Sequence, residues 1–357
     1  MPIARSPLFQ LFLPAVLAIC TAVFQADAHA NAAPPSCTAV AQATCKVARE
    51  LGRGINLGNM LEAPQEGEWG VRVDPEYVRI VTGSFSNVRV PVRWSNHAAL
   101  TADATLDEAF AQRVDHVVDA LLAKGVYVVL DLHHYNQLVG APLLREQQVD
   151  PEVLEIRLIN MWRQIAQRYR DRSPKLIFEL LNEPNRRLDA AAWNALAPRV
   201  LAAVRASNPD RTVMIGPVEW NSVRELKSLK VPPDRNLIVT FHNYDPFDFT
   251  HQGVPYLGRD IPTGTTCCSA RQKAQIADAM ETARAWSAKT GYPLYLGEFG
   301  SFERADIHSR AAYTRIVRDE AEKRGIPWAF WEFASTFGVW SPKTGTWLEP
   351  LRSALLD

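Results

Sequence analysis

The chain has 357 residues, with 39 basic and 39 acidic side chains and no formal net charge at pH 7. This balance gives no electrostatic reason to bind nucleic acid or an anionic membrane surface, so we expect neither as a partner. A neutral substrate fits the composition better.

The first thirty residues have the pattern of a secretory signal peptide. Arg5 precedes an apolar stretch over residues 8–24, and alanines at positions 26, 28 and 30 offer a cleavage site. A membrane anchor is the weaker alternative, because Pro14 interrupts a stretch shorter than the ~20 residues that a spanning helix needs. We therefore expect a secreted protein, extracellular or periplasmic, from which residues 1–30 are removed.

Four cysteines remain in the exported part of the chain, namely Cys37, Cys45, Cys267 and Cys268. Cys37 and Cys45 are close enough in sequence for a local disulfide. The partners of the adjacent pair stay open, because four cysteines allow three pairings. Neither pair has the spacing of a zinc site with nearby histidines, so no metal is expected.

Eight short apolar runs are typical of buried strands and recur along the exported chain. They lie at residues 54–57, 87–92, 126–132, 176–181, 212–216, 237–241, 293–297 and 327–333. Amphipathic helix patterns lie between most of them. This alternation predicts a single-domain α/β fold, a (β/α)8 TIM barrel over residues 51–357, with residues 31–50 packed on it as an N-terminal segment.

Several residues indicate where the helices begin and end. Thr105 with Glu108, and Ser269 with Gln272, match the capping-box pattern. Pro198 falls inside an otherwise helical run and predicts a kink or a break there. The glycines that follow helical runs and precede strands are Gly125, Gly291 and Gly325.

The fourth predicted strand ends abruptly in polar residues. Its apolar run is followed by Asn182, Glu183 and Pro184, and the proline prevents further ladder pairing. In a parallel barrel the chemistry lies at the carboxyl ends of the strands, so Glu183 is a candidate catalytic group. Other strands end in a similar way, and the side chains there include Arg89, His133, His242, Tyr244, Glu298 and Trp331.

Glu183 and Glu298 are the two carboxylates that best fit a catalytic pair, because each lies at a strand exit and barrel closure could bring them face to face. Carboxyl groups about 5 to 5.5 Å apart across a glycosidic bond give retention, and groups about 6.5 to 9.5 Å apart give inversion. The sequence gives no distance between them.

The chain resembles glycoside hydrolase family five, the large cellulase family of retaining (β/α)8 enzymes. The motifs that carry the resemblance lie at residues 53–59 (RGINLGN), 88–92 (VRVPV), 131–133 (DLH), 181–184 (LNEP), 242–244 (HNY), 297–300 (GEFG) and 329–331 (AFW). The run at residues 244–253 resembles a loop of bacterial endoglucanases in this family, which favours β-1,4-glucan as substrate.

The resemblance implies a role for each residue at the strand ends, without a cofactor. Glu183 would be the general acid and base, and Glu298 the nucleophile. Arg89 and Tyr244 would hold Glu298 ionised and oriented. The remaining roles are a hydrogen bond to the sugar 2-OH from Asn182, positioning by His133 and His242, and a floor under the attacked sugar from Trp331.

The two catalytic carboxyl groups should have different pKa values. Burial under a bound sugar, and the charge of Glu298 nearby, should raise the pKa of Glu183 and keep it protonated for the first step. Once Glu298 carries the sugar its charge is gone, so Glu183 becomes more acidic and can deprotonate water.

Other polar residues near the motifs have a structural interpretation. Glu179 should point into the barrel as a buried charge paired with Arg53 or Arg89. His134 has the opposite strand parity to His133 and is assigned to the scaffold. Supporting or structural charges are expected at Asp131 and Glu332.

The aromatic residues fall into two groups. Core positions are expected for Trp162, Trp193, Trp286, Trp328 and Phe330. Sugar stacking or packing under a loop are both open for Trp69, Trp94, Tyr135, Trp220, Trp340 and Trp347.

The sequence thus predicts a secreted, retaining endo-β-1,4-glucanase that acts as a monomer. The alternatives are the same chemistry on mannan, xyloglucan or mixed-linkage glucan, because barrel loops set specificity, and a sugar-binding barrel without turnover. The presence of both glutamates argues against the last alternative.

Overall fold

The computed structural model describes residues 1–2, 35–141 and 148–357. The chain divides into residues 1–31 and a compact unit of residues 32–357, which is described here by itself. The expected signal peptide lies outside the described residues, apart from its first two. Within the described ranges, no helix is both long and apolar enough to cross a membrane.

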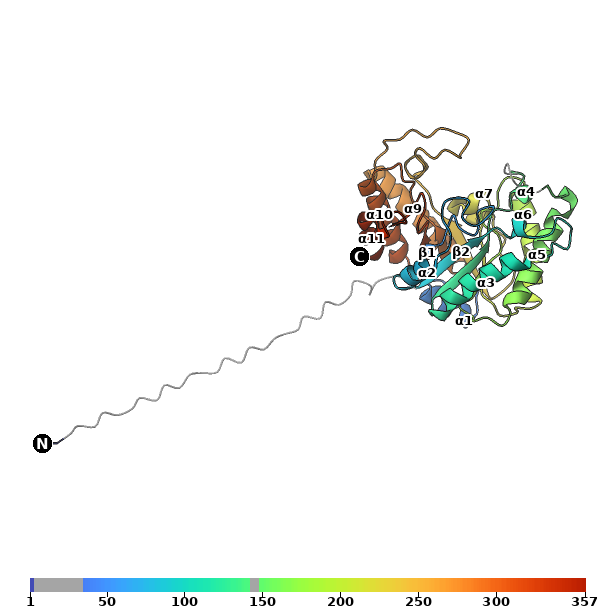
Figure 1. Cartoon of the computed structure of the whole chain (residues 1–357), viewed down its shortest axis with the longest axis horizontal. Coiled ribbons are helices and arrows are strands. Elements are labelled where there is room, and N and C mark those ends of the chain that lie inside the picture. Colours follow the sequence, from blue (N-terminus) through green and yellow to red (C-terminus); the bar gives the residue numbers. More distant parts are fainter. Residues whose placement is uncertain (3–34, 142–147) are drawn as a thin grey trace. The chain divides into compact units, whose positions relative to one another are not determined.

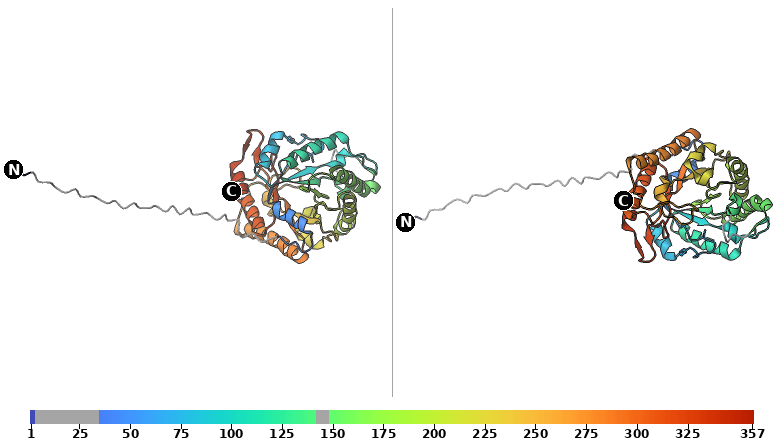
Figure 2. Two further views of the ribbon diagram at one scale, coloured as in Figure 1. Left: turned by 90° about the horizontal axis from the view of Figure 1, so that it is seen from below. Right: turned by 90° about the horizontal axis from the view of Figure 1, so that it is seen from above.

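The compact unit is a closed barrel of eight parallel strands in sequence order, as predicted. Figure 2 shows the strands encircled by helices. The strands are β1 (Arg53–Asn56), β2 (Asn87–Val92), β3 (Tyr127–Leu132), β4 (Leu176–Glu179), β5 (Val213–Ile215), β6 (Leu237–His242), β7 (Leu294–Glu298) and β8 (Trp328–Phe330). Each coincides with a predicted run, and β4 and β8 end earlier than expected.

Helices follow most strands and form the outer layer (Figure 1). The longer ones are α2 (Pro75–Thr82), α3 (Glu108–Ala123), α5 (Leu154–Tyr169), α6 (Ala190–Arg205), α9 (Ala270–Thr290), α10 (Ile307–Lys323) and α11 (Glu349–Leu356). Short turns include α4 (Asn136–Val139), α7 (Val218–Asn221), α8 (Phe247–Thr250), η1 (Trp94–His97), η2 (Pro151–Val153) and η3 (Val223–Ser228). The β5 to β6 connection therefore contains only short turns. A small hairpin, β9 (Trp340–Ser341) with β10 (Thr346–Trp347), precedes α11.

One of the two predicted capping boxes is wrong. Helix α3 begins at Glu108, and its cap is Asp107, whose carboxylate accepts from the backbone of Ala109 and Phe110. Thr105 cannot cap, because the next residue, Leu106, is extended in a bridge to Ala98. The Ser269 and Gln272 capping box on α9 is confirmed.

Other helix predictions also have clear outcomes. Pro198 was predicted to kink or break the helix; α6 continues through it as one helix, so the break is wrong. The three helix-terminating glycines adopt left-handed backbone angles, as their positions suggest. The indole side chains of Trp162, Trp193 and Trp328 are buried in the core as predicted, whereas Trp286 is half-buried against it.

The end of the barrel opposite the strand exits is closed by α1 (Gln42–Glu50). Ala48 and Leu51 pack on apolar side chains inside the barrel, including Val129 and Ile238. Just outside this helix, the backbone N–H of Ala41 donates to the carbonyl of Arg235 at 2.7 Å. Apolar packing thus seals this end and leaves polar groups to the other.

Both cysteine pairs form disulfides. Cys37 bonds to Cys45, which holds the start of α1 to the segment before it. Cys267 bonds to its neighbour Cys268 just before α9.

The Cys37–Cys45 bond should contribute measurably to stability. Replacing both residues by serine frees a short loop in the unfolded chain, and we expect a loss of about 2–3 kcal/mol in the free energy of unfolding by loop entropy. Urea unfolding followed by circular dichroism measures it. An unchanged midpoint would show that α1 stays in place without the bond. Catalytic activity of the folded variant should not change.

Candidate active site

A buried arginine organises the polar end of the barrel. Arg89, in the middle of β2, has no solvent exposure. Its Nε and Nη2 donate to both carboxylate oxygens of Glu179 at 2.8 and 3.0 Å, and Nη1 donates to Asn56 at 3.0 Å. This bidentate pair confirms that Glu179 is a buried, paired charge. Arg53, the other candidate partner, pairs with Glu322 instead.

The same guanidinium also contacts a chain of groups from β3 and the β4 exit. Its Nη2 lies 2.9 Å from Asp131 and donates to the Asn182 side-chain oxygen at 2.8 Å. The Asn182 amide nitrogen lies 3.1 Å from Nε2 of His133, whose Nδ1 lies 2.6 Å from Asp131. This arrangement requires His133 to donate through Nδ1 and accept at Nε2. Burial lowers its pKa well below the usual value, which agrees with a neutral ring.

Glu298 is held at both carboxylate oxygens. Arg89 donates to Oε1 and the Tyr244 hydroxyl donates to Oε2, each at 2.8 Å. These are the two partners that the sequence predicts. Burial, with a contribution from the nearby Glu183, raises the pKa of Glu298 above its usual value, although His242, Arg89 and Tyr244 oppose the rise. Tyr244 keeps its proton, because burial and the adjacent carboxylates raise its pKa well above the usual value.

Glu183 is held more loosely. It lies beyond the end of β4 with a left-handed φ of 51°, and 23% of its side chain is exposed. One oxygen lies 2.9 Å from Nδ1 of His242. Burial raises the pKa of Glu183 to about 8, with Arg89 opposing and with Asp131 and Glu179 adding to the rise. The direction of the shift is as predicted and burial is its main cause, but the acids that add to the rise are Asp131 and Glu179 and not the predicted Glu298.

The two candidate catalytic carboxylates lie close together. The nearest oxygens of Glu183 and Glu298 are within 4.8 Å of each other, and His242 lies between them, with Nδ1 3.6 Å from Glu298. His242 is neutral at pH 7, because burial lowers its pKa to about 4. The other ring nitrogen lies 3.3 Å from the Asn221 amide. Three ligand atoms at this spacing could hold a cation, but Arg89 adjoins them and disfavours one.

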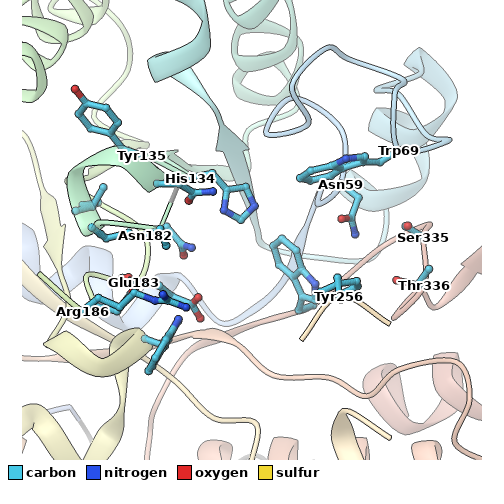
Figure 3. A pocket seen from close by; sticks show the side chains of 17 residues that line it. Asn59, Trp69, His134, Tyr135, Asn182, Glu183, Arg186, Tyr256, Ser335 and Thr336 are labelled. Carbon is cyan, nitrogen blue, oxygen red and sulfur yellow. Dashed lines mark hydrogen bonds between the residues drawn. The ribbon is translucent and has the colours of Figure 1, made fainter. Parts of the chain in front are cut away.

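A cavity of about 560 Å³ opens above Glu183 (Figure 3). Loops after six strands contribute to it: its lining residues include Asn59, Trp69, His134, Tyr135, Asn182, Arg186, Trp220, Tyr256, Trp331, Ser335 and Thr336. In Figure 3, Asn59, Ser335 and Thr336 lie on the side of the cavity opposite Asn182, Glu183 and Arg186. The wall is rich in aromatic and neutral polar groups, which suits an uncharged sugar chain.

For six aromatic residues the sequence left open whether they stack on sugar or pack under a loop, and the structure separates those that line the cavity from those that do not. Trp69 and Trp220 line the cavity and are 36% and 48% exposed. Tyr135 also lines it but is buried, with its hydroxyl bonded to Arg157. Trp94 is buried and packs edge-on against Phe110. The hairpin residues Trp340 and Trp347 pack on Phe333 and are absent from the cavity lining.

Trp331 lines the cavity beside the candidate catalytic groups. Its ring is nearly parallel to that of His133, with centroids 5.7 Å apart and an interplanar angle of 10°. The neighbouring residue, Glu332, is buried and accepts backbone N–H groups of Ala334, Ser335 and Phe337. It therefore shapes the following loop, which agrees with the structural role that the sequence assigns to it.

The structure corrects the interpretation of His134. This residue was expected to be structural because of its strand parity, but it lines the cavity next to Trp69, with ring centroids 5.8 Å apart. Strand β3 ends at Leu132, and His134 has a left-handed φ of 54°. The alternation of a strand therefore does not apply to it.

Sequence reasoning missed several other residues of the wall. Asn59 lies at the end of the quoted motif of residues 53–59, and that position could have drawn attention to it. Tyr256 follows the loop of residues 244–253. No feature of the sequence distinguished Arg186, Ser335 or Thr336.

The match to a known protein family agrees with this geometry. Residues 65–336 match the family model described as cellulase (glycosyl hydrolase family 5). The chain belongs to this family. Endoglucanase H of Acetivibrio thermocellus is 33% identical over 300 residues, which cover 84% of this chain and 31% of that protein. Endoglucanase A of Clostridium longisporum is 28% identical over 348 residues, which cover 87% of this chain and 65% of that protein. The family member described here thus spans less than two thirds of these relatives.

Solved structures give the same family. Endoglucanase Cel5A of Thermotoga maritima has a TM-score of 0.82 and 40% identity, covering 87% of this chain and 98% of that one. Structures of the Thermotoga enzyme with cellobiose and with mannotriose show 39% identity and the same TM-score of 0.82.

The Arg89 network should dominate the stability of the polar end. Arg89→Met leaves Asp131 and Glu179 buried without their cation, so we expect the free energy of unfolding to fall by about 3–5 kcal/mol. The matched control is Arg53→Met, which breaks a partly exposed pair with Glu322 and should cost about 1 kcal/mol or less. Urea unfolding compares the two. Equal losses would contradict the role given to Arg89.

Proposed function

We propose that this family member is a retaining endo-β-1,4-glucanase, with Glu183 as general acid and base and Glu298 as nucleophile. The observation that carries the proposal is the approach of the two carboxylates, whose nearest oxygens lie within 4.8 Å. This bound is compatible with the separation of about 5 to 5.5 Å between the carboxyl groups of retaining enzymes, and it lies below the about 6.5 to 9.5 Å of inverting enzymes.

In the first step, Glu298 attacks the anomeric carbon and Glu183 gives its proton to the departing glycosidic oxygen. Hydrogen bonds from Arg89 and Tyr244 fix the direction of the Glu298 carboxylate before the substrate arrives. The raised pKa of Glu183 supplies the proton at neutral pH.

In the second step, water cleaves the glycosyl ester on Glu298. Esterification removes a negative charge beside Glu183, so its pKa falls and it can accept the proton of the attacking water. The remaining N–H of the Asn182 amide is directed by bonds to Arg89 and His133, and it is assigned to the sugar 2-OH.

The wall of the cavity supports a β-glycan as substrate. Trp331 beside the catalytic pair, and Trp69 and Trp220 farther out, offer flat faces for pyranose rings. β-1,4-glucan is favoured because several relatives carry the name endoglucanase. β-Mannan is the second candidate, because the Thermotoga enzyme was also solved with mannotriose.

Export through residues 1–30 and action as a monomer without a cofactor belong to the same proposal.

Substitution of either carboxylate tests the assignment. Glu298→Ala and Glu183→Ala should each lower kcat on carboxymethylcellulose by at least ~1,000-fold, since each removes a group that acts in both steps. Reducing-sugar assays measure the rate, and circular dichroism checks the fold. Near-native activity in Glu298→Ala would show that another group is the nucleophile.

A panel of cello- and manno-oligosaccharides, with product analysis, decides between the two substrates.

The pH dependence should reflect the acid. Glu183 must be protonated for the first step, so activity is present below its pKa and falls as pH rises through about 8. The dependence of kcat/KM on pH for a neutral oligosaccharide measures this limb. A loss of activity already centred near pH 5 would contradict the raised pKa.

A further inference from the structure

Arg186 combines an unfavourable backbone conformation with an exposed position in the cavity wall. Its φ is 52°, in the left-handed region that favours glycine. The side chain lines the cavity and is exposed (Figure 3). Such conformations persist where the surrounding structure enforces them, and they cluster at sites that bind ligands.

The local turn shows what enforces the conformation. The Asn185 amide donates to the carbonyl of Glu183 at 2.6 Å, and the N–H of Leu188 donates to the carbonyl of Asn185 at 3.0 Å. These bonds fold the chain sharply after the candidate acid. The turn places Arg186 three residues beyond Glu183, on the same wall of the cavity.

The guanidinium of Arg186 is uncommitted in the part of the chain that the structure describes. It makes no ion pair or side-chain hydrogen bond with another described residue. The neighbouring Arg187, by contrast, donates to the carbonyl of Gln137 at 3.2 Å. Glu219, an exposed acid next to Trp220, is not among the residues that line the cavity.

Among the lining residues that the structure describes, the net charge is therefore positive. Among the described lining residues, Glu183 is the one carboxylic acid and Arg186 is the one basic side chain of permanent charge. Burial raises the pKa of Glu183 to about 8, so this group is neutral at lower pH. Burial also keeps His134 neutral by lowering its pKa well below the usual value. At neutral pH, the positive charge of the described part of the cavity wall is therefore that of Arg186.

The position of Arg186 indicates which part of the substrate it meets. Glu183 delivers its proton to the departing half of the chain, and Arg186 lies on the loop that carries Glu183. The backbone of Trp220 donates to the carbonyl of Pro184 at 3.4 Å, so the Trp220 loop adjoins this wall. Asn59 and Thr336 lie on the opposite side (Figure 3).

We propose that Arg186 is a specificity-determining residue that binds a carboxylate carried by the leaving portion of the glycan. Such a group occurs on uronic acid branches and on carboxymethyl ethers. The planar guanidinium fits a carboxylate through two parallel hydrogen bonds, and a charge at the mouth of a cleft also attracts anionic chains from solution. This inference rests on the proposed glycanase function.

The test compares an anionic with a neutral polymer. For the wild type and Arg186→Gln, kcat/KM is measured on carboxymethylcellulose and on uncharged hydroxyethylcellulose. In the variant, the ratio of the two values should fall about three- to fivefold at low ionic strength, while the rate on hydroxyethylcellulose stays near that of the wild type. In ~1 M NaCl the Debye length is about 3 Å, so most of the difference should disappear.

Three further variants separate charge from backbone effects. Arg186→Lys keeps the charge but loses the two parallel hydrogen bonds, so its ratio should lie between those of the wild type and Arg186→Gln. Arg186→Gly should lose the ratio as Arg186→Gln does, yet raise the Tm, because glycine adopts the positive φ without strain. Arg271→Gln removes the same charge from an exposed position of α9 outside the cavity and should leave the ratio unchanged.

Two results would overturn the proposal. One is an unchanged ratio in Arg186→Gln, and the other is an equal fall in Arg271→Gln, which would reflect net charge alone. A wild type that cleaves neither polymer would refute the proposed glucanase function itself, and this inference with it.

Discussion

The polar end of the barrel depends on one buried cation that faces more acidic groups than it can neutralise. Arg89 contacts Asp131, Glu179 and Glu298 directly, and Glu183 lies near this cluster. In a cluster that is largely buried, one guanidinium compensates only in part for the burial of four carboxyl groups. The pKa of each is consequently raised, mainly by burial. Burial therefore favours a proton within this cluster, and its placement on Glu183 is what the proposed roles require.

The hydrogen bonds favour different protonation states for the two catalytic groups. Glu298 receives a guanidinium and a phenol hydroxyl, both of which stabilise a carboxylate. Glu183 has only the neutral His242 ring and partial contact with the cavity. The proton is therefore easier to place on Glu183. In the proposed mechanism, two chemically identical side chains would differ as nucleophile and acid through their surroundings.

Much of the architecture could be predicted from the sequence because its causes are local or periodic. Runs of buried strand residues separated by amphipathic helices specify the barrel, and the rule that chemistry gathers at the carboxyl ends of strands selects Glu183 and Glu298. The predicted Glu179 pair follows from the same reasoning, since a carboxylate inside a barrel needs a cation. Arg89 was one of two candidates, and only the structure decides between them.

The errors lie where strand periodicity stops. His134 was assigned to the scaffold by alternation, but β3 has already ended and a left-handed residue turns the ring into the cavity. Glu183 also lies past the end of β4, so its inward direction follows from its backbone turn and not from the parity it shares with Glu179. Thr105 does not cap α3, because the next residue, Leu106, is extended in a bridge to Ala98. Sequence patterns do not reveal such single-residue backbone states, and Arg186 belongs to the same group.

The central claim is that Glu183 and Glu298 act by double displacement on a β-glycosidic bond. Proton NMR of the first product formed from a cello-oligosaccharide tests it most directly, before the anomers equilibrate. Two displacements at the anomeric carbon restore the original configuration, so the account predicts that the β anomer appears first. Early appearance of the α anomer would contradict it.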